Sequence, residues 1–228
     1  MKTANCDIKT CFLCKNCTPA WRELVALRKE IVSFKKGDVL FKEGDAVTGI
    51  YFLHSGAVKV QKNWTGDKDL IIRFCKPGDI VGHRGLTPDA KYPVTAIALA
   101  QSEACYITTG FLETTLKADP GFMYQLLQFY SAELQKTELR MRNLALADVR
   151  ARIAETLLEL LNTFGKNKNQ YITVPVTRQD IAAYAGTTYE TVFKILKTLV
   201  TAKIISTSGK SIRINDETKL RKLVKTAK

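Results

Sequence analysis

The stretch Thr177–Leu199 constrains the fold more than any other part of this 228-residue chain. Its apolar residues recur at helical spacing on both sides of its single glycine, which predicts two short amphipathic helices. Thr177 stands three residues before Asp180, and Thr187 stands three residues before Glu190, a spacing typical of capped helix starts. Two helices joined by a glycine-containing turn form a helix-turn-helix.

The outer face of the second helix carries polar and cationic side chains that can reach base edges and phosphates. After it, Ile204–Ile214 forms two alternating runs around a Ser-Gly-Lys turn, which predicts a β-hairpin. A winged helix-turn-helix is therefore the simplest description, and the alternative is a pair of helices in an all-α domain that never touches DNA. The candidate DNA-binding residues are Arg178, Thr188, Tyr189, Glu190, Lys194, Lys197 and Lys210.

The distribution of charge supports the DNA-binding alternative. The chain has a net charge of +13, and residues 146–228 hold 15 Lys/Arg against 7 Asp/Glu. The basic excess is concentrated around the helix-turn-helix, as neutralisation of phosphates requires. The sequence has neither a run of 18 apolar residues nor an apolar signal peptide. We therefore expect a cytoplasmic protein with no membrane partner, whose six cysteines are thiols or ligands rather than disulfides.

The region before residue 120 has a different period. Trp21–Ile31 has the spacing of a short amphipathic helix, but between Ser33 and Ile107 apolar residues alternate with a period of two. Glycine, usually followed by aspartate, punctuates this region at regular intervals, including residues 65–67. Short strands with such turns predict an antiparallel β-sandwich or barrel.

A long helix should follow Asp119-Pro120-Gly121 and run to about Leu146, because neither glycine nor proline interrupts this stretch. Apolar residues step along it by four and three, which predicts a seam for pairing with a second copy, although an ordinary core-facing helix has a similar pattern. The seam residues are Met123, Leu127, Tyr130, Leu134, Met141 and Leu144, with Thr137 as the polar exception. Residues 148–164 should form a further helix, and residues 171–174 a strand leading into the helix-turn-helix.

These elements predict an α+β protein with three functional regions. Residues 1–120 would hold a cysteine-containing leader and an antiparallel β-roll that acts as the effector domain. Residues 121–146 would form the dimerisation helix, and residues 147–228 the winged helix-turn-helix.

The order of these parts resembles the Crp/Fnr family of bacterial transcription regulators over essentially the whole chain. The resemblance is carried by KKGDVLFKEGD, YFLHSGAVKV and KPGDIVG in the β-roll, RNLALADVRARIAETLLELL after it, and VTRQDIAAYAGTTYETVFKILKTL in the helix-turn-helix. It implies a homodimer on a two-fold symmetric operator of double-stranded DNA, with an effector sensed in the β-roll and RNA polymerase as a candidate partner.

The family's cyclic-nucleotide branch holds the ligand in a short cassette, and the matching positions here depart from it. Gly82 matches the cassette glycine, but His83 stands where that branch has Glu, and Tyr92-Pro93 where it has Arg-Ser. Neither replacement supplies the acceptor for a ribose hydroxyl or the cation for a phosphate. Two positions on the long helix, Thr137-Glu138, correspond to the adenine-facing pair. The resemblance therefore argues against cyclic AMP and leaves the effector unidentified.

Another branch of the family carries an iron–sulfur cluster on three N-terminal cysteines and one in the β-roll. The matching cysteines here are Cys11, Cys14, Cys17 and Cys105, with Cys6 as a spare, and their N-terminal spacing differs from that branch's. Three alternatives stay open: an iron–sulfur cluster, a structural zinc site on the same thiolates, or unliganded thiols.

Two other functions are weaker alternatives. A cyclic-nucleotide-binding module without DNA reading would need the cassette Glu and Arg, and a thiol redox enzyme would need its CxxC beside a βαβ unit. The sequence supplies neither. His54 and His83 are the only histidines, and neither is paired with a nucleophile in a catalytic pattern, so we expect no enzyme.

Overall fold

The computed structural model describes residues 8–64, 69–174 and 176–225. Cys6 and the turn expected at residues 65–67 lie outside these ranges. Contacts divide the chain into two compact units. One holds the described residues up to Asn63 together with Arg73–Gln135, and the other holds those of Trp64–Ile72 together with those from Lys136 onward. The division therefore falls inside the long helix, and within the described residues no helix is long and apolar enough to span a membrane.

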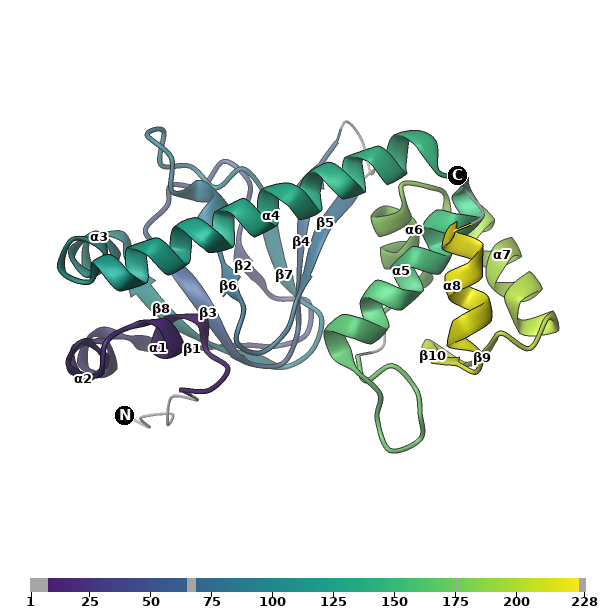
Figure 1. Cartoon of the computed structure of the whole chain (residues 1–228), viewed down its shortest axis with the longest axis horizontal. Coiled ribbons are helices and arrows are strands. Elements are labelled where there is room, and N and C mark those ends of the chain that lie inside the picture. Colours follow the sequence, from purple (N-terminus) through teal and green to yellow (C-terminus); the bar gives the residue numbers. More distant parts are fainter. Residues whose placement is uncertain (1–7, 65–68, 175, 226–228) are drawn as a thin grey trace. The chain divides into compact units, whose positions relative to one another are not determined.

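The expected β-roll consists of two antiparallel four-stranded sheets (Figure 1). Their strand orders are β1-β8-β3-β6 and β2-β7-β4-β5. The strands are β1 (Glu30–Phe34), β2 (Val39–Phe41), β3 (Gly49–Ser55), β4 (Val58–Asn63), β5 (Asp69–Cys75), β6 (Ile80–Val81), β7 (Thr95–Ala98) and β8 (Ser102–Thr108). Side chains such as Ile50, Phe52 and Ile107 are almost completely buried in the core, but the period of two is not strict, because Leu53 is buried beside Phe52.

The recurrent Gly-Asp pairs make the same turn several times. In the turn that ends at Asp38, glycine takes a φ of +92°, and the Asp38 amide donates to the Lys35 carbonyl (3.0 Å). The aspartate carboxylate accepts in return from the Lys35 amide (2.7 Å). A positive φ at the third position is the signature of a type II turn, which is why glycine stands there. The turns ending at Asp45 and Asp79 have the same bonds.

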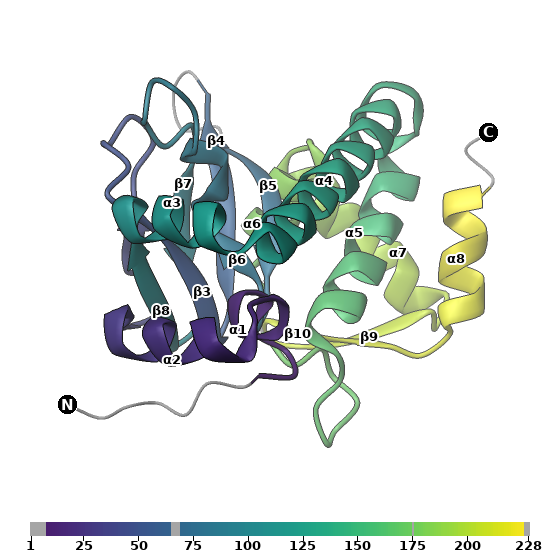
Figure 2. The ribbon, with the colours of Figure 1, turned by 60° about the vertical axis from the view of Figure 1, so that its left-hand side comes forward.

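The cysteine-containing leader is folded onto the roll. It forms helices α1 (Phe12–Asn16) and α2 (Pro19–Arg28), which lie beside strand β8 in both views (Figures 1 and 2). The Phe12 amide donates to the Gly78 carbonyl (3.0 Å), and α1 joins the core cluster. The helix expected over Trp21–Ile31 ends earlier, because Lys29 is extended and Ile31 belongs to β1.

Two helices close the first unit. Helix α3 (Thr109–Ala118) is capped by the Thr108 hydroxyl, which accepts from the Phe111 amide (3.3 Å). Helix α4 (Pro120–Leu146) begins with proline, whose missing N–H costs nothing at a helix start. Its buried side chains Phe122 and Leu126 join the core of the roll. The long helix predicted from the seam is thereby confirmed.

The second unit contains the expected helical domain. Its elements are α5 (Val149–Phe164), α6 (Arg178–Ala185), α7 (Tyr189–Thr201), β9 (Ile205–Ser208), β10 (Ser211–Ile214) and α8 (Glu217–Lys225). The strand expected at residues 171–174 was wrong: Ile172 makes an isolated bridge with Lys166 instead. The sequence analysis also missed α8, whose Leu220 is fully buried.

Candidate nucleic-acid interface and effector cassette

The first helix of the helix-turn-helix begins and ends as its sequence predicts. The Thr177 hydroxyl accepts from the Asp180 amide (3.0 Å), and the Asp180 carboxylate accepts from the Thr177 amide (3.1 Å), which completes a capping box on α6. Gly186 ends α6 with a φ of +62°, a left-handed conformation that favours glycine. Ile181 on α6 and Val192 on α7 are completely buried, so the core faces of the two helices lie inward.

The predicted reading residues lie on the opposite face of α7. Glu190, Lys194 and Lys197 are exposed, and the Tyr189 side chain is 43% exposed. The backbone N–H of Glu190, followed by the Thr188 hydroxyl, holds the pKa of the Glu190 carboxyl below its usual range, so this side chain is an ionised acceptor at neutral pH. This face can therefore accept hydrogen bonds at its start and donate them further along.

Two further residues of the predicted set support this face. The second helix cap lies one residue later than expected: the Thr188 hydroxyl, not that of Thr187, accepts from the Thr191 amide (3.3 Å). The Arg178 guanidinium lies 5.8 Å from the centre of the Phe193 ring, a cation–π contact between α6 and α7.

The wing is an antiparallel hairpin whose turn contains Gly209 and Lys210. Gly209 has a φ of +56°, and the Lys210 side chain is exposed at the tip. The hairpin is tied to the segment before α6, because the Ile172 amide donates to the Ile212 carbonyl (2.9 Å). This places a cation at the end of a short, anchored loop.

The sequence analysis missed Arg152, on α5, which fixes the end of α6. Its guanidinium donates to the carbonyls of Ala185 (2.9 Å) and Gly186 (3.3 Å). It also donates to those of Leu144 (3.2 Å) and Ala147 (3.0 Å), at the end of α4. Carbonyls at a helix C-terminus have no partner within the helix, so a cation there is stabilising.

The cassette begins with a glycine in the left-handed backbone region and a buried histidine. Gly82 has a φ of +94° and leads into the 3-10 turn η1 (His83–Gly85). The His83 side chain is only 4% exposed, with its ring edge-on to Phe129 (5.0 Å between centroids). Burial, together with Arg73 and Arg84, lowers the pKa of His83 to about 3, so the imidazole is neutral. Within the described residues its Nδ1 has no hydrogen-bond partner.

Tyr92 fills the other side of the cassette. Its ring stacks on that of Phe41 (3.8 Å between centroids), and its hydroxyl donates to the Gly49 carbonyl (2.5 Å). A methyl group added at Gly82 would lie 3.2 Å from Tyr92 Cε1, so the ring leaves little room for a side chain at this position. The half-buried Pro93 presents its carbonyl to Lys62 Nζ (2.9 Å). The chain's own aromatic side chains therefore occupy the space beside the cassette glycine.

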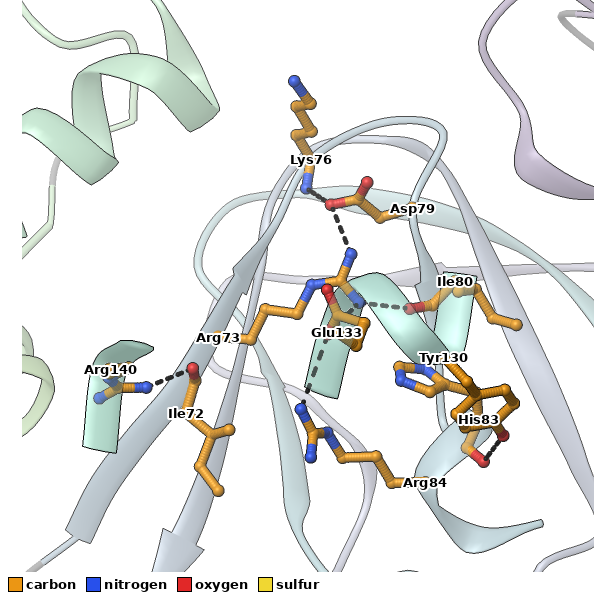
Figure 3. Close-up of polar contacts among 10 residues, drawn as sticks. All are labelled: Ile72, Arg73, Lys76, Asp79, Ile80, His83, Arg84, Tyr130, Glu133 and Arg140. Carbon is orange, nitrogen blue, oxygen red and sulfur yellow. Dashed lines mark hydrogen bonds and ion pairs between the residues drawn. The ribbon is translucent and has the colours of Figure 1, made fainter. Parts of the chain in front are cut away.

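A charge network covers the cassette, and the sequence analysis missed it (Figure 3). The buried Glu133 carboxylate of α4 lies 3.4 Å from Arg73 and 3.6 Å from Arg84. Arg73 also pairs with Asp79 (3.4 Å). The Tyr130 hydroxyl, one turn before Glu133, donates to the His83 carbonyl (2.6 Å). Both arginines are thus paired with carboxylates of the chain itself.

The predicted seam residues divide into two groups on α4. An exposed apolar row is formed by Met123, Leu127, Leu134 and Met141. Tyr130 and Leu144 are half-buried against their own chain instead: Tyr130 bonds His83, and a methyl group at Gly186 would lie 2.9 Å from Leu144 Cδ2. Thr137 and Glu138 are exposed on the same helix.

The parts of this chain match those of known regulators. A family model of the cyclic nucleotide-binding domain matches residues 31–119, and one of the Crp-like helix-turn-helix domain matches residues 151–223. The anaerobic regulatory protein of Bacillus subtilis is 30% identical over 168 residues, which are 72% of this chain and 71% of that protein. The chain belongs to the Crp/Fnr family.

Other Crp/Fnr proteins match over similar lengths. The cAMP-activated global transcriptional regulator CRP of Pasteurella multocida is 30% identical over 165 residues, covering 72% of this chain and 79% of that protein. The structure of FixK2 from Bradyrhizobium japonicum superposes with a TM-score of 0.76 at 26% identity, covering 86% of this chain and 96% of FixK2. The protein is therefore a DNA-binding transcription regulator, in a family where homodimers and effector sensing are typical.

The Crp/Fnr resemblance raised a metal site, and the described cysteines do not form one. Cys11, Cys14, Cys17 and Cys105 are all buried in one hydrophobic cluster. In the described part of the chain, however, no three cysteine, histidine or carboxylate side chains are grouped to hold a metal ion. A hydrogen bond with Cys14 lowers the pKa of the Cys11 thiol to about 6, whereas burial raises that of Cys17 to about 12. The four cysteines therefore share one buried cluster, but within the described residues their side chains are not arranged as a set of metal ligands.

Proposed function

We propose that this regulator works as a homodimer that reads a two-fold symmetric DNA operator with helix α7 of each protomer. The outer face of α7 carries the proposal: Tyr189, Glu190, Lys194 and Lys197 are exposed there, while Val192 and Leu199 hold the helix on its core. A recognition helix of this kind enters the major groove with its first residues at the base edges.

Within this face, Glu190 and Lys194 have complementary roles. A carboxylate accepts a hydrogen bond from the cytosine N4 amine, and an ammonium donates to guanine O6 or N7. Lys194 lacks the two-pronged geometry of arginine, so we expect softer discrimination at its base pair. Lys210 at the wing tip and Lys197 further along α7 suit contacts to phosphates, which position the protein without reading sequence.

The exposed apolar row on α4 supports the dimer. Leu127, Leu134 and Met141 are each more than 60% exposed, and such a row on a regular helix is suited to packing against a second copy. Two recognition helices related by a two-fold axis can enter successive major grooves about 34 Å apart.

The remaining assignments follow from DNA binding and from the cassette. We propose that the protein acts in the cytoplasm, with RNA polymerase as its protein partner and without enzymatic activity; the support is that its relatives are named as transcriptional regulators. We also propose that its effector is not cyclic AMP, because His83 and Tyr92 are buried where a nucleotide would need an acceptor and a cation.

The operator can be found by selecting binding sites from a random DNA pool with the wild-type protein. The expected product is an inverted repeat with half-sites one helical turn apart. Glu190→Ala should then lower affinity for this operator by about 1–3 kcal/mol and relax preference at one base pair per half-site. Lys210→Ala is the control, because a lost phosphate contact weakens operator and random DNA alike. If Glu190→Ala lowered the affinity for operator and random DNA equally, base reading by this residue would be excluded.

A further inference from the structure

Three backbone carbonyls from distant parts of the sequence converge on one side chain, that of Arg140. Its guanidinium donates to the carbonyls of Ile71 and Ile72 on β5, the second of which is drawn in Figure 3. It also donates to the Tyr184 carbonyl on α6 (2.9 Å). Arg140 itself lies on α4, so one cation joins three elements.

The contact with α6 is made where that helix is short of partners. Tyr184 lies in the last turn of α6, whose carbonyls have no amide to accept from within the helix and carry partial negative charge. Arg140 supplies a donor and a positive charge there, and its guanidinium also lies 4.0 Å from the centre of the Tyr184 ring. The planar guanidinium can stack and donate at the same time, which an ammonium cannot do.

The contact with β5 continues a second link between the same two elements. Arg73 directly follows Ile72 and pairs with Glu133 (3.4 Å), two helical turns before Arg140 on α4. Residues seven apart on a helix lie on one face. Strand β5 is therefore joined to α4 through neighbouring residues on each side: a side-chain ion pair at Arg73 and backbone hydrogen bonds at Ile71 and Ile72.

We infer that Arg140 is a positioning residue for DNA reading. It fixes the C-terminal end of α6 to α4 and to β5, and α6 in turn packs against α7. Without Arg140, α6 keeps its capping box and the Arg152 link to the end of α4, but it loses its direct bond to Arg140 and, with it, its hold on β5. The recognition face of α7 then has to be ordered when it binds, which costs free energy. Operator binding is weakened more than non-specific binding, because only base reading requires a precisely placed helix. This inference rests on the operator reading proposed above.

The test uses three full-length variants: Arg140→Ala, Arg140→Lys and Arg142→Ala. Arg142 is the matched control, because it is exposed on the same helix and its guanidinium bonds the neighbouring Asn143 Oδ1 (3.1 Å). Arg140→Ala should lower affinity for the selected operator about tenfold and affinity for random DNA less than twofold. The operator affinity of Arg140→Lys should lie between those of wild type and Arg140→Ala, and this variant guards against misfolding of the alanine variant. Arg142→Ala should change operator affinity less than twofold.

Two further measurements separate positioning from other roles. The salt dependence of operator binding should be unchanged in Arg140→Ala, because loss of a phosphate contact would reduce its slope by about one. Amide hydrogen exchange without DNA should be faster in residues 178–186 of that variant than in wild type. The inference is overturned if Arg140→Ala binds the operator with wild-type affinity. It is also overturned if this variant loses the same affinity for operator and random DNA and the slope of its salt dependence is reduced. If wild type selects no operator, the proposed function fails, and unchanged exchange on α6 would overturn the inference independently.

Discussion

The outer face of α7 and the cassette around His83 use polar side chains in opposite ways. On α7, Glu190 and Lys194 are exposed, with hydrogen-bonding capacity left for a partner. In the cassette, Glu133 pairs with two arginines and the Tyr92 hydroxyl bonds a backbone carbonyl, so these groups have their partners inside the chain. Membership of the Crp/Fnr family therefore describes how this protein binds DNA far better than which effector it senses.

The largest effect is expected from a charge in the exposed row of α4. Leu134→Asp should dissociate the dimer, because it would bury an unpaired carboxylate near the two-fold axis at a cost of about 3–5 kcal/mol or more. Operator affinity should fall by a factor of several hundred or more, as 1.4 kcal/mol corresponds to tenfold. Sedimentation velocity and operator titration measure the two effects. Gln135→Asp, which adds the same charge on an adjacent exposed position, should leave the dimer intact; an intact Leu134→Asp dimer would show that the exposed face of α4 is not the interface.

The second effect tests whether the cassette is closed by packing. Tyr92→Ala removes a buried ring stacked on Phe41, and should lower the free energy of unfolding by roughly 3 kcal/mol, since the roll cannot fill the space. Tyr92→Phe keeps the ring and loses the hydrogen bond to Gly49, so about 1 kcal/mol is expected. Denaturant unfolding of both variants gives the comparison. If Tyr92→Ala and Tyr92→Phe lowered the free energy of unfolding by similar small amounts, the ring would not be part of a packed core.

The elements that sequence analysis predicted are those with local signals. The helix-turn-helix has a capping box at Thr177 and buried residues at helical spacing, and the wing has a glycine with positive φ in its turn. Helix α8 packs on α5 and has a local signal that the sequence analysis overlooked: Leu220, Leu223 and Val224 are spaced by three and four residues, and the Asp216 carboxylate accepts from the Lys219 amide (2.9 Å). Residues 171–174 alternate like a strand, but their backbone hydrogen bonds to residues 165–167 and to Ile212 make an isolated bridge and not a strand.

The difference between local and tertiary signals also explains which site residues could be predicted from the sequence. Glu190 and Lys194 share one face of a single helix, so spacing alone placed them together. Glu133, Arg73 and Arg84 come from α4, β5 and η1, and only tertiary structure brings these distant charges into one network. Backbone carbonyls such as those bound by Arg140 have no sequence signature at all. The half-burial of Tyr130 was missed because a heptad pattern cannot tell a neighbour within the chain from one on a second copy.

A third effect follows from the neutral His83. Burial lowers its pKa from 6.5 to about 3, so below pH 6.5 the unfolded chain binds a proton that the folded chain does not. This contribution to stability is complete above pH 6.5 and is lost as the pH falls towards 3. Between pH 7 and pH 5 wild type should lose about 2 kcal/mol relative to His83→Leu, from 1.36 kcal/mol per pKa unit.

The measurement is the free energy of unfolding by denaturant at several pH values for both proteins. His54→Leu is the matched control, because His54 is the other histidine and is half-buried on β3. A difference between wild type and His83→Leu that does not change with pH would contradict a neutral, buried imidazole.

The smallest effect is the response to cyclic AMP, which should be nil. Binding in the family's usual manner needs an acceptor for the ribose and a cation for the phosphate, and His83 and Tyr92 stand at those positions. His83 is neutral and buried, and the Tyr92 ring would have to leave its stack on Phe41, so each ligand contact would cost a native one. Micromolar cyclic AMP should give no heat in calorimetry and no gain in operator affinity, in a preparation whose operator binding proves it active. A stoichiometric isotherm would show that the cassette opens, and Tyr92→Ala would then bind more tightly than wild type because the ring no longer has to be displaced.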